Sequence, residues 1–348
     1  MNRAAMEEES TANDSAANGS SPVTFPGTDL LQRYKPFFIL LYGALVAVAC
    51  LGNAFLIGCI AADKKLHNAT NFFIGNLSAA DLLMCLCCVP LTLSYAFEPQ
   101  GWLYGGFMCH LTSLLQSATV YVSVLSLTAI AVDRYMLVAH PVRRRIRLGA
   151  CGTAVGGIWL LSLALAAPAA AHVRYLELRR AGSDVNVCEE FWRGMERERL
   201  AYSCLVMLGS YVVPLAAVTT SYWAISVRLR RSGVPEAGRQ NQAAWNRKRR
   251  RVFALLAASA ATFAACWLPL QTLNLVRDLD ADFQILDVRY LNVAQVSCHW
   301  LAMSSSCYNP FIYASLHRKC RLRFLHRLRR CRWHGRAPPA SRSTSLVN

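Results

Sequence analysis

The chain has 348 residues, of which 54% are hydrophobic and only 16% are charged, and its formal net charge is +17 at pH 7. A soluble domain carries about 25% charged residues, so this composition excludes an ordinary soluble protein. The positive charge does not indicate a nucleic-acid-binding protein, because the basic runs lie on separate segments between apolar blocks and not on one face.

The chain begins with a polar, acidic segment, residues 1–36, which we expect to be an extracellular tail. Asn13 and Asn18 each begin an Asn-x-Ser triplet, so both are candidate glycosylation sites.

Seven apolar blocks follow, and each is long enough to cross a bilayer, which takes about 20 helical residues. Lipid offers no partners for backbone amides, so continuous blocks of this length must be helices. The sequence therefore predicts an all-α membrane protein, a seven-transmembrane helix bundle over residues 37–314. The expected helices are residues 37–62, 71–97, 106–138, 150–171, 199–230, 247–277 and 290–314.

Two segments follow the last apolar block. Residues 315–330 alternate apolar and basic side chains, which predicts a short amphipathic eighth helix on the membrane surface, although a solvated basic tail would have the same composition. Residues 331–348 are rich in Ser and Pro and are expected to be a disordered cytoplasmic tail. Because basic residues that flank membrane helices stay in the cytoplasm, we expect the N-terminus outside and the C-terminus inside.

The fourteen cysteines divide by compartment. Most lie within apolar blocks and are expected to be small core residues. Cys109 and Cys188 lie at the outer side of the membrane, where an oxidising environment favours a disulfide between them. Cys320 and Cys331 follow the last apolar block, where a cysteine carries either palmitate or a free thiol.

Polar residues inside a membrane are costly, and those found here form short motifs, one or two on each apolar block. They are Gly52-Asn53, Asp81, Asp133-Arg134-Tyr135, Trp159, Pro214 with Tyr222, Trp267-Leu268-Pro269, and Asn309-Pro310 with Tyr313.

In this order the motifs resemble the class A, rhodopsin-like, G-protein-coupled receptors, and the resemblance runs from about residue 37 to residue 330. Further stretches are similar to receptors for peptides that end in Arg-Phe-amide, which are relatives of the neuropeptide Y receptors. These stretches are residues 66–72, 95–102, 188–192, 277–280 and 298–305. The resemblance implies a plasma-membrane receptor whose partners are heterotrimeric G proteins, arrestin, receptor kinases and membrane lipids.

The resemblance also assigns residues to signalling. It implies a sodium ion at Asp81; a protonated Asp81 in a hydrogen-bond network is the alternative. It implies that Arg134 meets the G protein and is held at rest by Asp133. The expected sodium-site partners are Asn53, Ser123, Ser306 and Asn309, and the expected switch and coupling residues are Tyr135, Tyr222, Pro214, Val124, Phe263, Asn309, Pro310 and Tyr313.

The third apolar block restricts the ligand. An amine receptor needs a carboxylate seven residues after the cysteine of that block, where this chain has the neutral Gln116. A retinal protein needs a lysine at the position of Met303. An outer rim rich in acidic and aromatic residues instead favours a cationic peptide. The rim residues are Glu98, Trp102, Glu189, Glu190, Phe191, Trp192, Asp278, Asp280 and Asp282.

Likeness to the receptors for amidated peptides then implies separate roles within the site. Gln116, Thr92 and His299 would hold the terminal amide, while Asp278 and Glu190 would pair with the ligand's arginine. The residues expected to line an aromatic pocket are Tyr95, Trp267, Gln271 and Asn274. Ordinary solvated loop charge is the alternative for each rim acid, and a peptide of the neuropeptide Y type is the alternative ligand.

Two other classes of protein find no support. The chain has no P-loop, HExxH or GxSxG motif, so no enzyme is indicated. It has neither internal repeats with broken helices nor rings of charge, which a transporter or a channel requires.

Overall fold

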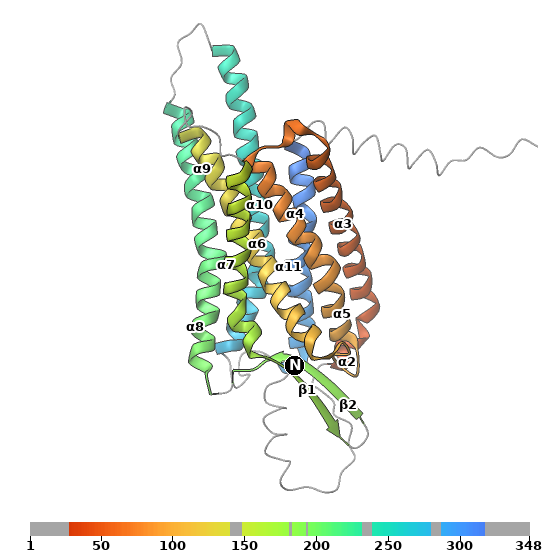
Figure 1. The fold of residues 1–348 in the computed structure, drawn as a ribbon. Helices are drawn as coiled ribbons and strands as arrows, with labels where there is room; N and C mark the ends of the chain where they lie inside the picture. Colours follow the sequence, from red (N-terminus) through yellow and green to blue (C-terminus); the bar gives the residue numbers. More distant parts are fainter. Residues whose placement is uncertain are drawn as a thin grey trace, which may run out of the picture.

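The computed structural model describes residues 28–139, 148–180, 183–192, 194–231, 239–279 and 287–316. These residues form a bundle of long helices with one antiparallel hairpin, β1–β2, at one end (Figure 1). The elements in chain order are α2 (Thr28–Arg33), α3 (Lys35–Ala62), η1 (Lys64–Leu66), α4 (Ala69–Leu83), η2 (Met84–Cys88), α5 (Val89–Phe97), α6 (Gly105–Ala139), α7 (Leu148–His172), β1 (Val173–Arg180), β2 (Ser183–Glu190), α8 (Glu196–Met207), η3 (Leu208–Val212), α9 (Val213–Arg231), α10 (Arg239–Leu279) and α11 (Val288–Leu316).

Each predicted helix is present, and the helical class is confirmed. The second is built from α4, η2 and α5, and the fifth from α8, η3 and α9. The sixth begins at Arg239, earlier than the expected residue 247, and the expected tail ends in the short helix α2. Asn13, Asn18, Cys320, Cys331, Asp280 and Asp282 lie outside the described residues, as does nearly all of the expected eighth helix.

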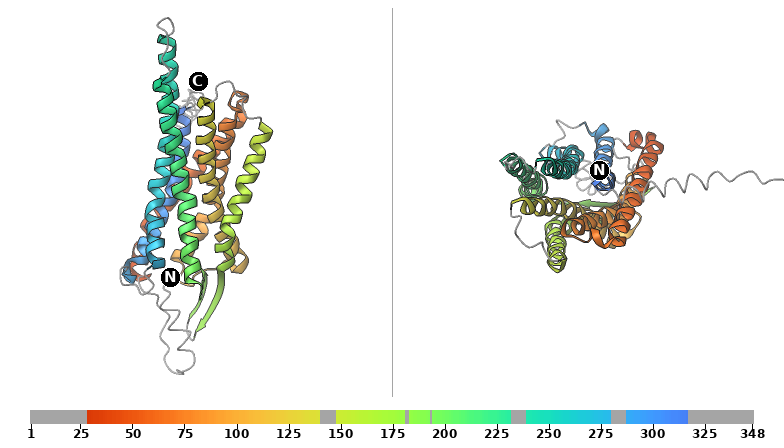
Figure 2. Two further views of the ribbon diagram at one scale, coloured as in Figure 1. Left: turned by 90° about the vertical axis from the view of Figure 1, so that its left-hand side faces the viewer. Right: turned by 90° about the horizontal axis from the view of Figure 1, so that it is seen from above.

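Seen along its axis the bundle closes on itself, because α11 contacts both α10 and α3 (Figure 2). Within the described ranges, five helices are long and apolar enough by themselves to cross a membrane. Large side chains on the outer surface are apolar: Leu51, Phe107 and Leu160 are 75%, 78% and 72% exposed. Polar residues such as Asp81 lie in the interior instead, which is the reverse of a water-soluble bundle.

Among the described residues, two of the membrane helices contain a wide π-helical turn that the sequence did not predict. The turn η2 ends two residues before Pro90, and η3 ends two residues before Pro214. Proline has no amide hydrogen and cannot complete the helical ladder, and a wide turn is one way to absorb that break. The turn in the second helix therefore sets the rotation of α5, which carries Thr92 and Tyr95 to the binding site.

The hairpin is fastened over the end of the bundle. Trp102 donates its amide hydrogen to the Asn186 carbonyl (2.8 Å), and the Asn186 amide donates to the Gln100 carbonyl (2.9 Å). Gly101 between them has a φ of +75°, and a Cβ there would lie 2.2 Å from the Asn186 carbonyl oxygen, so only glycine fits. The predicted disulfide Cys109–Cys188 is confirmed and ties β2 to the start of α6.

We expect loss of this disulfide to destabilise the folded chain strongly. The bond closes a loop of 79 residues, for which chain entropy gives about 4.5 kcal/mol. The double variant Cys109→Ser/Cys188→Ser should therefore unfold at a clearly lower temperature in purified form. Cys204→Ser, which changes an exposed free cysteine, is the matched control. Equal unfolding temperatures of the two variants would contradict the stabilising role.

Candidate functional site

Two connected chambers open at the hairpin end of the bundle. The smaller, about 240 Å³, is lined by residues of α6, α7, α8, α10, α11 and the hairpin. The larger, about 640 Å³, lies among α2, α3, α5, α6, α11 and the hairpin. Gln116, Ser117 and Arg277 line both chambers. The predicted ligand-binding residues in the smaller chamber are Gln116, Glu190, Trp267, Gln271, Asn274 and Asp278, and those in the larger are Thr92, Tyr95, Trp102, Gln116 and His299.

One expected grouping is wrong. Tyr95 does not line the same pocket as Asn274, Gln271 and Trp267, but lies in the larger chamber. Its hydroxyl accepts the Cys188 amide hydrogen (3.3 Å) and donates to Glu189 (3.2 Å), and its ring packs edge-on against Trp102. Contacts with the hairpin therefore hold Tyr95 away from α10.

Gln116 lies at the junction of the chambers in a chain of hydrogen bonds. Its Oε1 accepts from the Thr92 hydroxyl (3.0 Å), and its Nε2 lies 3.1 Å from Nε2 of His299. Nδ1 of His299 lies 2.8 Å from the Tyr42 hydroxyl, which donates to the Val296 carbonyl (2.9 Å). The structure thus brings together the three residues expected to hold a terminal amide.

The donors and acceptors available at Gln116 and His299 determine the direction of each hydrogen bond in this series. The Gln116 Nε2 can only donate, so Nε2 of His299 accepts and its ring proton is on Nδ1, which faces Tyr42. One amide hydrogen and one lone pair of Gln116 are then left for a ligand. A primary amide offers the complementary pair, whereas a carboxylate can only accept.

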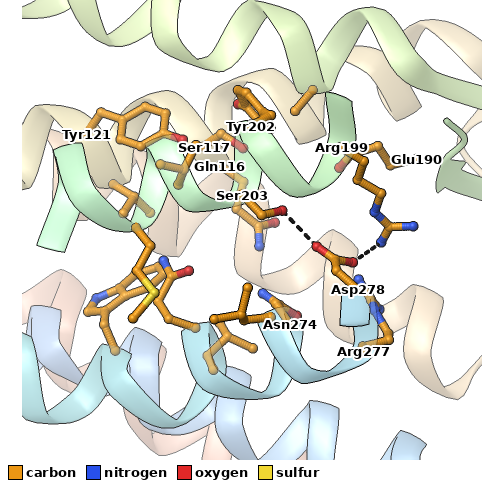
Figure 3. Close-up of a pocket in the computed structure, with 18 of the residues that line it drawn as sticks. Gln116, Ser117, Tyr121, Glu190, Arg199, Tyr202, Ser203, Asn274, Arg277 and Asp278 are labelled. Carbon is orange, nitrogen blue, oxygen red and sulfur yellow. Dashed lines mark hydrogen bonds and ion pairs between the residues drawn. The ribbon is translucent and has the colours of Figure 1, made fainter. Parts of the chain in front are cut away.

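Asp278 is held by a cation of the chain itself. An oxygen of its carboxylate lies 2.7 Å from Nη2 of Arg199, and the other accepts from the Ser203 hydroxyl (2.7 Å), as Figure 3 shows. The sequence predicted that Asp278 is available to a ligand, and no pattern in it indicated Arg199 or Ser203 as partners. Their spacing places both on one face of α8, but nothing in the sequence pairs that face with α10.

Glu190 is fixed at the end of β2 by aromatic residues. The Trp192 indole N–H donates to its carboxylate, and Trp192 stacks between His172 and Tyr202. Burial raises the pKa of Glu190 above its usual value, while the Trp192 hydrogen bond and then Arg199 and Arg277 oppose that rise. The carboxyl is therefore easier to protonate than that of an exposed glutamate.

Trp267 forms part of the wall of the smaller chamber and leads toward the expected switch residues. Its indole N–H donates to Ser305 (3.2 Å), and its ring stacks on Phe263 with centroids 5.6 Å apart. Phe263, Val124 and Pro214 line a small cavity of about 20 Å³. The predicted switch residues Phe263, Val124 and Pro214 therefore lie together, and Phe263 is in direct contact with Trp267.

The buried Asp81 accepts hydrogen bonds from Asn309 (2.9 Å), Ser306 (3.0 Å) and Ser123 (3.4 Å). Asn53 is not among these donors to Asp81. Its Nδ2 donates to the Ser306 carbonyl instead (3.1 Å). Its buried Oδ1 has no hydrogen-bond partner within the described part of the chain. Carboxylate, hydroxyl and amide oxygens are hard donors, so this group fits a sodium ion.

At the opposite end of the bundle, Asp133 is buried and accepts from the Thr70 hydroxyl of α4 (2.5 Å). Arg134 and Tyr222 line one small cavity with Ile225 and Phe253. Tyr313 is fully buried among residues of α3, α4 and α6. The expected contact between Asp133 and Arg134 stays a prediction.

Residues 52–313 match the family described as 7 transmembrane receptor (rhodopsin family). The chain belongs to this family. A neuropeptide F receptor of Drosophila melanogaster is 32% identical over 84% of the chain, and a substance-K receptor of Bos taurus is 32% identical over 92%. A neuropeptide Y receptor type 2 of Homo sapiens is 29% identical over 94%. The matches cover 62%, 81% and 88% of these three receptors, so the chain spans less than two thirds of the fly receptor's length.

Family membership confirms the resemblance to class A G-protein-coupled receptors and identifies the bundle as a multi-pass membrane protein. The family is one of receptors and not of enzymes. It also accounts for the apolar outer surface, which faces lipid, and for the polar interior.

Proposed function

We propose that the chain is a receptor for a neuropeptide with an amidated C-terminus, and that its ligand is prolactin-releasing peptide, which is of the Arg-Phe-amide type. The observation that carries this proposal is the position of Gln116 between Thr92 and His299, at the junction of the chambers. The relatives named as neuropeptide F, neuropeptide Y and substance-K receptors support a peptide ligand.

The smaller chamber suits the arginine that precedes the terminal phenylalanine. Asp278 and Glu190 provide carboxylates there, and Trp267 provides an aromatic wall. Among the described residues, Oδ1 of Asn274 is a buried acceptor without a hydrogen-bond partner. A guanidinium group has five donors and can satisfy a carboxylate and such an acceptor together.

A neuropeptide Y-type peptide is the second candidate. Two of the relatives are named as receptors for neuropeptide F and neuropeptide Y, and neuropeptide Y-type peptides also end in an arginine followed by an amidated aromatic residue. The run Glu189-Glu190-Phe191-Trp192 favours the Arg-Phe-amide peptide, since it resembles the receptors for that class.

In this proposal the hairpin end is extracellular and the end with Arg134 is cytoplasmic, at the plasma membrane. A peptide that moves Trp267 would alter the packing of Phe263 against Pro214 and Val124, and so favour an outward movement of α10. Arg134 would then meet a heterotrimeric G protein, and later arrestin and receptor kinases would act at the same end. Asp81, Ser123, Ser306, Asn309 and Asn53 would hold a sodium ion that stabilises the inactive packing.

Peptide affinity should fall as the pH is lowered from neutral through the raised pKa of Glu190. Ligand cations favour the ionised carboxylate, and burial makes Glu190 take up a proton before an exposed glutamate does. The dissociation constant should rise as the pH is lowered, both for the unmodified chain and for the control Glu177→Gln, whose side chain is exposed. The Glu190→Gln variant should lose this dependence; an unchanged pH profile would exclude Glu190 from the cation site.

The function is tested by second-messenger signalling in cells that express the chain, with amidated prolactin-releasing peptide and neuropeptide Y given side by side. A response to the first at far lower concentration is expected. Preference for neuropeptide Y would replace the ligand and keep the receptor class. Silence to both peptides, with the chain shown at the cell surface, would contradict the proposed roles of Gln116, Glu190 and Asp278.

A further inference from the structure

We propose that Arg199 is a built-in competitor for the ligand's arginine, and that it sets both the affinity and the selectivity of the smaller chamber for guanidinium groups. The proposal rests on the proposed function, since it concerns the same carboxylate of Asp278. It begins from one fact: the acid best placed to bind a ligand's arginine already binds an arginine of the chain.

The contact imitates the one expected of a ligand. Nη2 of Arg199 lies 2.7 Å from one carboxylate oxygen of Asp278, and the Ser203 hydroxyl lies 2.7 Å from the other. Figure 3 shows Arg199 and Ser203 reaching from one helix, α8, toward Asp278 on α10, with Glu190 beside Arg199. An entering guanidinium would find its main acceptor taken by the same chemical group.

The two partners differ in how easily they can leave. The Arg199 side chain is 18% exposed and that of Asp278 is 5% exposed, so Arg199 has access to water and Asp278 does not. Arginine also has a long flexible stem, whereas the aspartate carboxylate is held close to its helix. Exchange of one guanidinium for another at Asp278 therefore requires movement of Arg199 only.

Arg199 and Asp278 each lie at a helix end whose dipole has the same sign as their own charge. Arg199 lies in the first turn of α8, where the helix dipole is positive, and Asp278 lies in the last turn of α10, where the dipole is negative. Arg199 and Asp278 therefore each need a counter-charge, but the helix dipoles give no preference for Arg199 over another cation at Asp278. A ligand's guanidinium at Asp278 would lie in the same field, so the helix ends do not distinguish it from Arg199.

The charges of the chamber make displacement necessary. Its ionisable lining consists of the acids Glu190 and Asp278 and the bases Arg199 and Arg277, so the formal charges cancel. Asp278 becomes available to a third arginine only when Arg199 moves out. A lysine would replace a planar, forked donor by a single ammonium, so Arg199 should exclude amines more effectively than guanidinium compounds.

Removal of the competitor should therefore increase affinity. If Asp278 is released from Arg199 about one tenth of the time, the apparent dissociation constant is about tenfold above the intrinsic one. Arg199→Gln should lower the constant for a guanidinium probe by about this factor and reduce the preference for guanidinium over ammonium. A residue that only braces α8 against α10 would have the opposite effect, because its loss would loosen the chamber.

The test uses the purified full-length chain and two small probes, L-argininamide and L-lysinamide, with dissociation constants taken from thermal unfolding at increasing probe concentration. Arg199→Gln should bind L-argininamide about tenfold more tightly than the unmodified chain does. Arg197→Gln, with the same charge change on an exposed residue of the same helix, should bind it unchanged. The double variant Arg199→Gln/Asp278→Asn should lose the gain.

Arg199→Lys serves if Arg199→Gln does not fold, because it keeps the charge but not the fork and should give a smaller gain in affinity. Equal or weaker L-argininamide binding by the folded Arg199 variants would overturn the proposal. The probes contain no peptide, so this test of competition by Arg199 is independent of the test of the proposed peptide ligand. Silence of the unmodified chain to both peptides with the gain present would refute only the proposed function, and a peptide response without the gain would refute only the competitor.

Discussion

Replacement of Asp278 by alanine should weaken binding of an amidated Arg-Phe peptide by about 100-fold or more. Removing one member of a buried, hydrogen-bonded charge pair costs about 2–5 kcal/mol, and tenfold in affinity corresponds to about 1.4 kcal/mol. In this chain the loss has a second cause, because Arg199 would stay in the chamber without its counter-charge and repel the ligand's arginine. The measurement is displacement of labelled peptide from cell membranes.

A double-mutant cycle gives this prediction its control. A peptide whose arginine is replaced by citrulline should bind the unmodified chain poorly but should lose little more on Asp278→Ala, because the two changes remove the same contact. Glu198→Ala, which removes an exposed acid of α8, should leave both affinities as they were. Full additivity of the two losses would show that Asp278 and the ligand's arginine do not meet.

Replacement of Arg134 by alanine should abolish G-protein activation while peptide binding is kept. Arg134 lies beside Tyr222 near the C-terminal end of α6, whereas Gln116 of the chambers lies toward the start of that helix, so removal of Arg134 cannot alter ligand contacts directly. Second-messenger output and surface binding of labelled peptide, measured on the same cells, separate the two effects.

Arg134→Lys is the companion variant, because it keeps the positive charge and loses the planar fork of donors. We expect it to recover only part of the signal. Normal signalling by Arg134→Ala at equal surface density would remove Arg134 from the coupling site. Loss of peptide binding together with signalling would instead assign it a structural role.

The helices could be predicted because lipid leaves the backbone no alternative, and their ends were found to within a few residues except at Arg239. The cluster of Gln116, Thr92 and His299 was also predictable, since its residues occupy positions that the family resemblance assigns. The turns η2 and η3 were not, because Pro90 and Pro214 indicate a break in the ladder but not how the helix absorbs it.

The sequence also could not predict that the site is divided into two chambers, or that Arg199 is the partner of Asp278. Arg199 occurs in the alternating run Glu196-Arg197-Glu198-Arg199, which is typical of a solvated segment. Its role depends on the rotation of α8 relative to α10, which is set by packing between helices far apart in the chain. Tyr95 was misplaced for the same reason, because its partners Cys188 and Glu189 belong to a hairpin whose docking no local pattern reveals.

The most direct test of an amide-selective site at Gln116 is the affinity of one Arg-Phe peptide in two forms, C-terminal amide and free acid, for the chain at the cell surface. A free acid would bring a charge into a buried site and could not donate to Gln116, so we expect the amide to bind at least about 100-fold more tightly. Equal affinity of the two forms would contradict the assignment of Gln116, Thr92 and His299 as the site of the peptide's C-terminus.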